Sequence, residues 1–185
     1  GGAVLVIGEP GIGKSRLLAE SEALPEAARV RVVHATPGTL GTDEAEPRLL
    51  ARLLAALGAD AALAAFTSAE TLATSIGAAL ERASAEQPVA VLLDELHRAD
   101  APSMALLPQL ADRLASRAVL FVVATRPPDE DPETDDDLEH TLAPWLADVV
   151  RLGALSTDES RALVDAVASE PLADESRALV LAHGE

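Results

Sequence analysis

The sequence contains no cysteine, a single lysine and almost no aromatic side chains. Without cysteine, the chain can form neither a disulfide framework nor a thiolate metal site. Apolar runs such as Val89–Leu93 and Ala118–Ala124 are far too short to span a bilayer. The chain does not open with the basic and apolar segments of a signal peptide. We therefore expect a cytoplasmic protein without membrane contact.

Positive charge is also scarce, because the sequence has 14 basic and 31 acidic residues and a net charge of −17. Most of such a surface repels a phosphate backbone, so we expect no direct nucleic-acid binding by this segment. About half of the residues are apolar, largely Ala and Leu, which favours Ala/Leu helices around a small sheet. A length of 185 residues suits one domain, with the start of a second as the alternative.

The single lysine lies in the segment Gly8–Ser15, which fits the phosphate-binding pattern G-x-x-x-x-G-K-[ST]. A compact ammonium can reach between phosphates, whereas the planar fork of an arginine is too wide. The apolar run Ala3–Ile7 before the segment predicts a buried strand, and a helical pattern follows it. The alternative is a glycine-rich turn that matches the pattern by chance, which the strand before it and the helix after it disfavour. We predict a loop whose amides and helix N-terminus bind phosphate, with the Ser15 hydroxyl on Mg²⁺.

Apolar runs alternate with helical patterns along the whole chain, which predicts a parallel sheet with helices on both faces. The expected strands are Ala3–Ile7, Val30–His34, Val89–Leu93, Ala118–Ala124 and Asp148–Leu152. The expected helices are Ser15–Leu24, Pro47–Leu57, Ala59–Phe66, a helix from the capping box Thr67–Glu70 to about Ala85, Pro102–Ala115, a helix from the capping box Ser156–Glu159 to about Ala168, and Ala173–His183. Residues 36–46 and the acidic segment 127–139 are expected to be loops.

Carboxylates follow the strand Val89–Leu93 directly. In a phosphate-loop fold, Asp94 at the strand tip would hold Mg²⁺ together with Ser15, and Glu95 would orient or deprotonate the attacking water. The alternative is an acidic pair at a surface strand end. Thr125 and Arg126 end another strand and would face the terminal phosphate, unless Arg126 instead pairs with the acidic loop.

Three further residues have expected roles. His97 fits a structural position at a helix start better than a catalytic one. Asp100, ahead of Ala101 and Pro102, is expected to cap a helix. Trp145 is expected to fill a core or an interface.

Three segments, Gly8–Ser15, Leu92–Asp100 and Val122–Pro127, together resemble the AAA-type ATPase module of the signal-transduction ATPases with numerous domains (STAND). The origin-recognition-like ATPase domain of large ATP-binding LuxR-type transcriptional regulators is the most similar type. Arg98 departs from that family, which usually has Trp at this position. The resemblance implies an α/β P-loop NTPase fold of the ASCE/AAA-like type. Its parallel five-stranded sheet would have the order 5-1-4-3-2 and would be followed by a helical lid.

The resemblance also implies ATP, ADP and Mg²⁺ as ligands and a set of site residues. Nucleotide binding is assigned to Gly8, Glu9, Pro10, Gly11, Ile12, Gly13, Lys14, Ser15, Arg16 and Thr125, metal binding to Ser15 and Asp94, and catalysis to Lys14, Glu95 and Arg126.

The expected domains are an ATPase core over 1–153 and the beginning of a lid over 154–185, because Arg151–Ser156 resembles the family's entry into the lid. We expect the chain to be a fragment of a longer protein. Its adenine-contacting segment would precede residue 1, and an output domain, often helix-turn-helix, would follow residue 185. Self-association through the ATPase module is also expected.

The expected function is an ATP-binding switch that hydrolyses ATP slowly. Ring-forming motors supply an arginine finger to the neighbouring subunit, and residues 127–150 contain neither Arg nor Lys. The alternative is the ATPase of a replication initiator or clamp-loader-like machine, which the acidic charge disfavours. A small-molecule phosphotransferase would need an Arg-rich lid, whereas the loop after Arg126 is acidic. A transporter ATPase would need a signature motif that the sequence lacks.

Overall fold

The computed structural model describes residues 1–23, 29–37, 47–58, 68–127 and 138–167. It divides into two units, Gly1–Leu152 and Gly153–Glu185, and each is treated by itself. The predicted helices over 59–66 and 173–183, and most of the two predicted loops, lie outside the described residues.

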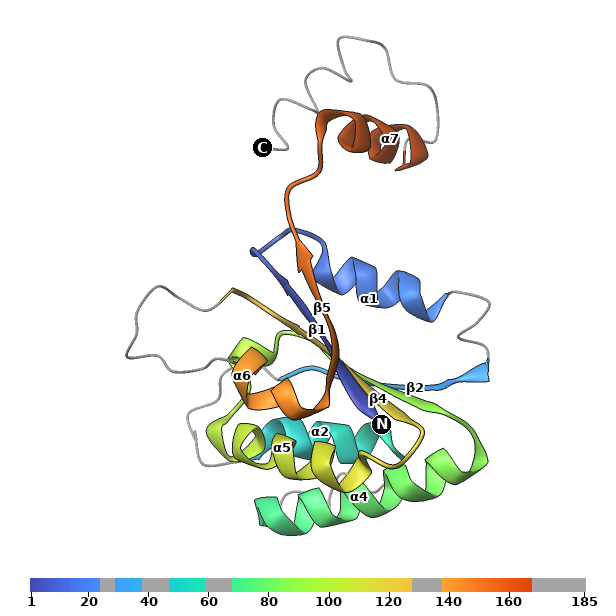
Figure 1. Cartoon of the computed structure of the whole chain (residues 1–185), viewed down its shortest axis with the longest axis vertical. Helices are drawn as coiled ribbons and strands as arrows, with labels where there is room; N and C mark the ends of the chain where they lie inside the picture. The colour runs from blue at the N-terminus through green and yellow to red at the C-terminus, as the bar shows by residue number, and fades with distance from the viewer. Residues whose placement is uncertain (24–28, 38–46, 59–67, 128–137, 168–185) are drawn as a thin grey trace. The chain divides into compact units, whose positions relative to one another are not determined.

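Five parallel strands of the first unit form one sheet in the order β2-β3-β4-β1-β5 (Figure 1). The strands are β1 (Gly2–Gly8), β2 (Arg31–Ala35), β3 (Val89–Leu93), β4 (Val119–Thr125) and β5 (Leu146–Leu152). The order predicted from the sequence is confirmed, since 5-1-4-3-2 describes the same sheet from its other edge. The bounds expected for Val89–Leu93 are confirmed. Two other expected strands are shifted by one residue and two are shorter by two residues, because β-branched runs mark a strand but not its ends.

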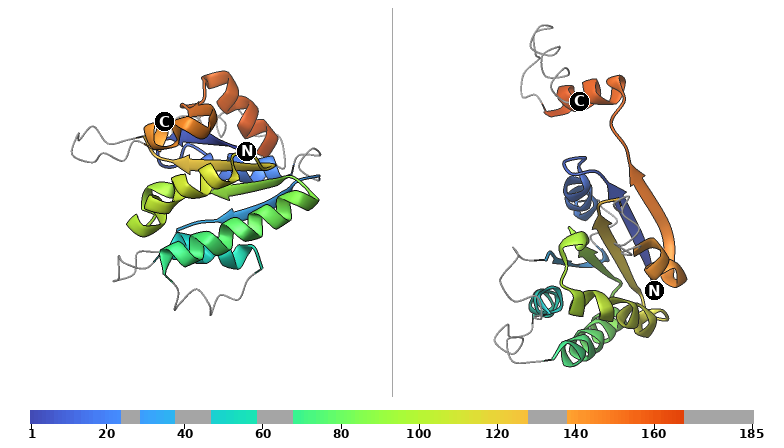
Figure 2. Two further views of the ribbon diagram at one scale, coloured as in Figure 1. Left: turned by 60° about the horizontal axis from the view of Figure 1, so that its bottom comes forward. Right: turned by 90° about the vertical axis from the view of Figure 1, so that its left-hand side faces the viewer.

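Helices cover both faces of the sheet, and successive strand residues alternate between two cores. Leu5 and Ile7 belong to the larger core, whereas Val6 packs with Leu18 in a smaller one. The larger core lies under α2 (Arg48–Ala56), α4 (Ala69–Glu86) and α5 (Ala101–Leu114), and the smaller one lies under α1 (Lys14–Glu22). Figure 1 shows α1 on one side of the sheet and the other three helices on the opposite side. In the left view of Figure 2, the cyan and green helices α2 and α4 run side by side beneath the strands.

Short elements that the sequence did not predict complete the unit. They are the 3₁₀ turn η2 (Leu96–Arg98), the helix α6 (Leu138–Leu142) and the 3₁₀ turn η3 (Ala143–Trp145). The predicted loop therefore ends earlier than expected, because Leu138 and Leu142 lie four residues apart and both are buried. Trp145 packs against the larger core, as predicted.

Side chains cap α4 and α5. Asp100 Oδ1 accepts a hydrogen bond from Ser103 N at 2.8 Å, which confirms Asp100 as the N-cap of α5. Its second oxygen accepts from Leu49 N at 3.0 Å, so the same carboxylate ties α5 to α2. The N-cap of α4 is Ser68 rather than the predicted Thr67, because the helix begins at Ala69.

The second unit contributes one described helix, α7 (Thr157–Val167), and its capping box is confirmed. Ser156 N donates to Glu159 Oε2 at 2.8 Å, and Glu159 N donates to Ser156 Oγ at 3.3 Å. Among the helices of the described ranges, none combines the length and apolar character needed to cross a membrane.

An ion pair joins α4 and α5 beside Gly77. Arg113 of α5 reaches across this position and donates to both carboxylate oxygens of Glu81, at 2.8 and 2.9 Å, and to Thr74 O at 3.1 Å. A Cβ on residue 77 would come within 2.7 Å of the Arg113 guanidinium. The glycine therefore leaves room for an ion pair between the helices.

Gly77→Ala is expected to stabilise the fold less than an ordinary helix-interior Gly→Ala change, which gains about 1 kcal/mol. The new methyl displaces Arg113, so part of the gain is lost. In an Arg113→Ala background the full gain of about 1 kcal/mol should appear. Free energies of unfolding from urea titrations of the four proteins check this. Equal effects of Gly77→Ala in both backgrounds would contradict it.

Candidate functional site

The segment between β1 and α1 adopts backbone conformations that require glycine. Gly11 and Gly13 have φ values of +81° and +107°, in the region that other residues rarely occupy. A Cβ on Gly8 would lie 2.7 Å from Ile12 Cγ2, so the first glycine is needed for close packing of the loop on itself. Gly13 is the N-cap of α1, and the first turn of this helix carries no acidic side chain. The helix N-terminus is therefore suited to an anion.

Lys14 begins α1 and is only 8% exposed. Its ammonium donates to Gly8 O at 2.6 Å and to Glu9 O at 2.9 Å. Two carbonyl oxygens of the loop thus hold the single lysine of the chain beside the helix N-terminus. A buried ammonium of this kind is stable only with such acceptors, and a phosphate oxygen can replace them.

The carboxylates after β3 lie at the same edge of the sheet. Asp94 is 5% exposed, and its backbone N–H donates to Ala35 O of the neighbouring strand β2 at 3.2 Å. Glu95 has φ +52° and ψ +39°, and it is the one non-glycine residue with positive φ in the described ranges. Such strained backbone is common at functional sites. The backbone N–H of Glu95 donates to Asp94 Oδ1 at 2.8 Å, which helps to hold this turn.

Glu95 also forms an ion pair that was missed in the sequence. Arg98 Nη1 donates to Glu95 Oε2 at 3.0 Å, across the turn η2. The opposite charges three residues apart were the available signal, since a helical turn brings such residues together. Arg98, where the sequence departs from the family that it resembles, therefore holds the carboxylate that we expected to activate water.

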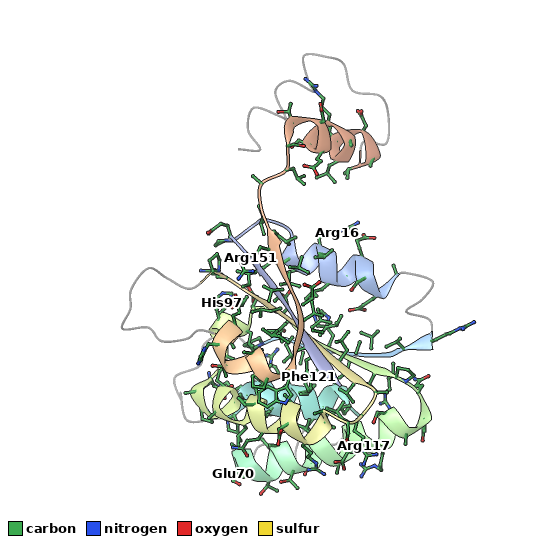
Figure 3. The ribbon with its side chains drawn as sticks, in the orientation of Figure 1. Arg16, Glu70, His97, Arg117, Phe121 and Arg151 are labelled. Atoms are coloured by element: carbon green, nitrogen blue, oxygen red, sulfur yellow. The ribbon has the colours of Figure 1, made fainter. Side chains whose placement is uncertain are left out.

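These elements enclose one cavity of about 300 Å³ at the strand ends. Its lining unites loop and helix residues with both carboxylates and with the end of β4: Pro10, Gly11, Gly13, Lys14, Ser15, Arg16, Asp94, Glu95, His97 and Arg126. Figure 3 shows His97 at this end of the sheet and Arg16 projecting from α1. The structure thus brings most of the expected site residues together.

Thr125 does not share this cavity with Lys14. It is 4% exposed and lines a neighbouring cavity of about 400 Å³, together with Gly8, Glu9 and Arg151. Arg126 lines both cavities. In the neighbouring cavity Arg151 pairs with Glu139 of α6, and both side chains belong to its lining.

His97 lies in the first cavity and not merely at the start of a helix. Burial lowers the pKa of its imidazole, the positive charge of Arg126 lowers it further, and the nearby carboxylate of Glu95 opposes both effects. The ring is therefore neutral near pH 7, as the lowered pKa requires.

The cavity residues fit a phosphate chain with a divalent cation. Lys14, Arg126 and the α1 N-terminus offer positive charge and N–H donors, which phosphate oxygens require. The Ser15 hydroxyl and the Asp94 carboxylate offer the hard oxygen ligands that Mg²⁺ prefers, and Mg²⁺ sites of this kind also use phosphate oxygens and water.

Comparisons with known proteins agree with this geometry. A model of the AAA ATPase domain matches residues 1–123. A comparison with curated proteins finds no match.

Solved structures share the fold. The Orc1 protein of Aeropyrum pernix, in complex with DNA, has a TM-score of 0.63 and 17% identity over 89% of this chain. Cdc6p of Pyrobaculum aerophilum has a TM-score of 0.61 and 15% identity over 88%. The STAND protein of Pyrococcus horikoshii, which carries a tetratricopeptide repeat sensor, has a TM-score of 0.58 and 18% identity over 97%. This chain spans 43%, 41% and 25% of those three chains.

At these identities the structural likeness establishes the fold, and it confirms the predicted P-loop NTPase architecture. The family model covers about two thirds of the chain, from before β1 to the body of β4. It also confirms the predicted AAA-type module, whose fold is common to origin-recognition and STAND proteins. The chain therefore belongs to the AAA ATPase domain family.

Proposed function

We propose that this chain is the ATP-binding module of a signal-transduction regulator and that it acts as a switch with slow hydrolysis. The observation that carries the proposal is the single cavity that unites Lys14, Ser15, Asp94, Glu95 and Arg126. Lys14 and the loop amides bind the phosphates, and Ser15 and Asp94 bind Mg²⁺. When bound, that Mg²⁺ would neutralise charge that develops on the phosphates as the terminal phosphoryl group is transferred to water.

Two features support a switch over a motor. Residues 127–150 contain no Arg or Lys that could act as a finger on a neighbouring subunit. In addition, Arg98 holds Glu95 in an ion pair, so the carboxylate is engaged before it can orient water. Both features lower the expected rate of hydrolysis and leave nucleotide binding intact.

The LuxR-type regulator is the specific form that we propose, with the unit Gly153–Glu185 as the beginning of its lid. Support comes from the motifs that resemble that family and from the shared fold of the Pyrococcus horikoshii STAND protein. The shared fold of Orc1, which was solved in complex with DNA, favours a replication initiator as the second candidate. The net charge of −17 speaks against DNA contact by this segment.

Lys14→Ala is expected to weaken Mg²⁺–ATP binding by at least about tenfold, because a charge-assisted contact to phosphate is lost. Isothermal titration calorimetry checks this. Arg82→Ala is the matched control, since it removes one exposed positive charge of α4 and Arg82 does not line the cavity. Equal affinities of Lys14→Ala and Arg82→Ala would overturn the proposed site.

Steady-state ATP turnover should lie below roughly one per second, at the low end of the usual enzyme range. Glu95→Gln should still bind ATP but hydrolyse it at least about 100-fold more slowly in single-turnover assays, as expected for loss of a general base. If Glu95→Gln hydrolyses ATP at the wild-type rate, Glu95 is not the general base.

Arg98→Ala is expected to raise the rate of hydrolysis by no more than about fivefold, because a partly exposed ion pair contributes less than about 1 kcal/mol. The side chains of Arg98 and Glu95 are 35% and 41% exposed. Single-turnover hydrolysis at saturating ATP measures the effect. A lower rate in Arg98→Ala would mean that Arg98 supports the chemistry and does not restrain Glu95.

A further inference from the structure

His97 stands apart from the other polar side chains of the described ranges. Both ring nitrogens, Nδ1 and Nε2, are shielded from solvent, and neither has a hydrogen-bond partner among the described residues. No other buried side-chain nitrogen or oxygen atom of those residues shares this property. Buried polar groups are nearly always paired, so an unpaired imidazole needs a physical reason.

The position of the ring suggests that reason. His97 belongs to the turn η2, which follows Asp94 and Glu95 after β3, and it lines the cavity that holds Lys14 and Arg126. His97 follows β3 and Arg126 follows β4, so the ring belongs to the side of the cavity that the ends of these two strands supply.

That side of the cavity suits the last phosphate of the chain. In phosphate-binding loops, the loop amides hold the inner phosphates and the lysine reaches the β- and γ-phosphates. Asp94, Glu95 and Arg126 line the same cavity, so a terminal phosphate that extends away from the loop would meet them. A neutral imidazole offers one N–H donor there and adds no charge.

We propose that His97 donates a hydrogen bond to the terminal phosphate of a bound nucleoside triphosphate, so that His97 as well as Arg126 distinguishes a triphosphate from a diphosphate. This inference rests on the proposed function. It assigns a ligand contact to a residue that would otherwise only pack in the turn η2. A packing role would change the stability of the fold, but it would change the binding of both nucleotides alike.

The test compares the affinities of Mg²⁺–adenylyl-imidodiphosphate, a triphosphate that is not hydrolysed, and Mg²⁺–ADP. Calorimetric titrations are made with the wild type and with His97→Ala, His97→Gln, Lys14→Ala and His34→Ala. His34→Ala is the matched control, because His34 lies on the edge strand β2 and has an exposed side chain beside Glu22. Thermal unfolding of each variant shows whether it is folded, and His97→Gln keeps a polar donor if His97→Ala is unstable.

His97→Ala is expected to weaken triphosphate binding by about tenfold or more and diphosphate binding by less than about twofold, as for loss of one hydrogen bond to a charged group. His97→Gln should restore part of the difference, and His34→Ala should change neither affinity. Equal losses for both nucleotides, or no loss, would overturn the role of His97. After such a result for His97→Ala, the affinities of Lys14→Ala separate two cases. If Lys14→Ala binds both nucleotides as tightly as the wild type, the proposed function fails. If Lys14→Ala binds them more weakly, only the inference about His97 fails.

Discussion

The ammonium of Lys14, held by the carbonyl oxygens of Gly8 and Glu9, is the interaction on which the site depends. A nearly buried positive charge must be paired, and here the loop pairs it with its own backbone. The loop can curl around the ammonium because Gly11 and Gly13 accept positive φ values. The same curl directs the N-terminus of α1 toward the cavity. One side chain thus links the strand end, the loop and the helix dipole.

The parallel sheet supplies the remaining groups by bringing the ends of its strands level with one another. Ile7 of β1 pairs with Thr125 of β4, and Leu93 of β3 pairs with Val123 of the same strand. The residues that follow these strands therefore meet at one edge, as ligand-binding residues do in open α/β sheets. Because β4 lies between β1 and β3, the phosphate loop and the carboxylates face each other across the end of β4. The order of the strands is thus a condition for the cavity.

Much of this arrangement could be predicted from the sequence because it depends on backbone periodicity. Continuous apolar runs mark strands buried on both faces, and the glycines with Lys14 mark the loop. The alternation of strand residues between the two faces of the sheet also determines where Thr125 lies, but we did not apply it to this residue. Ala124 packs in the smaller core with Leu18, so its neighbour Thr125 must lie on the opposite face of the sheet.

Other features depend on tertiary packing, which one sequence does not reveal. The burial of His97 results from the short turn η2, and no periodic pattern predicts a turn of three residues. The spacing of Glu95 and Arg98 was a signal for their ion pair, but nothing in the sequence indicates the left-handed backbone at Glu95, which is unusual for a residue with a side chain. These departures from local rules lie at the candidate site, where strain is most often retained.

The central claim is that Lys14 exchanges its loop carbonyls for a phosphate when nucleotide binds. A crystal structure of the chain with Mg²⁺ and adenylyl-imidodiphosphate tests it most directly. The account predicts the phosphate chain in the cavity between the loop and Asp94, with Lys14 Nζ within hydrogen-bond distance of phosphate oxygens. A nucleotide bound elsewhere, with Lys14 still donating to Gly8 O and Glu9 O, would contradict the account.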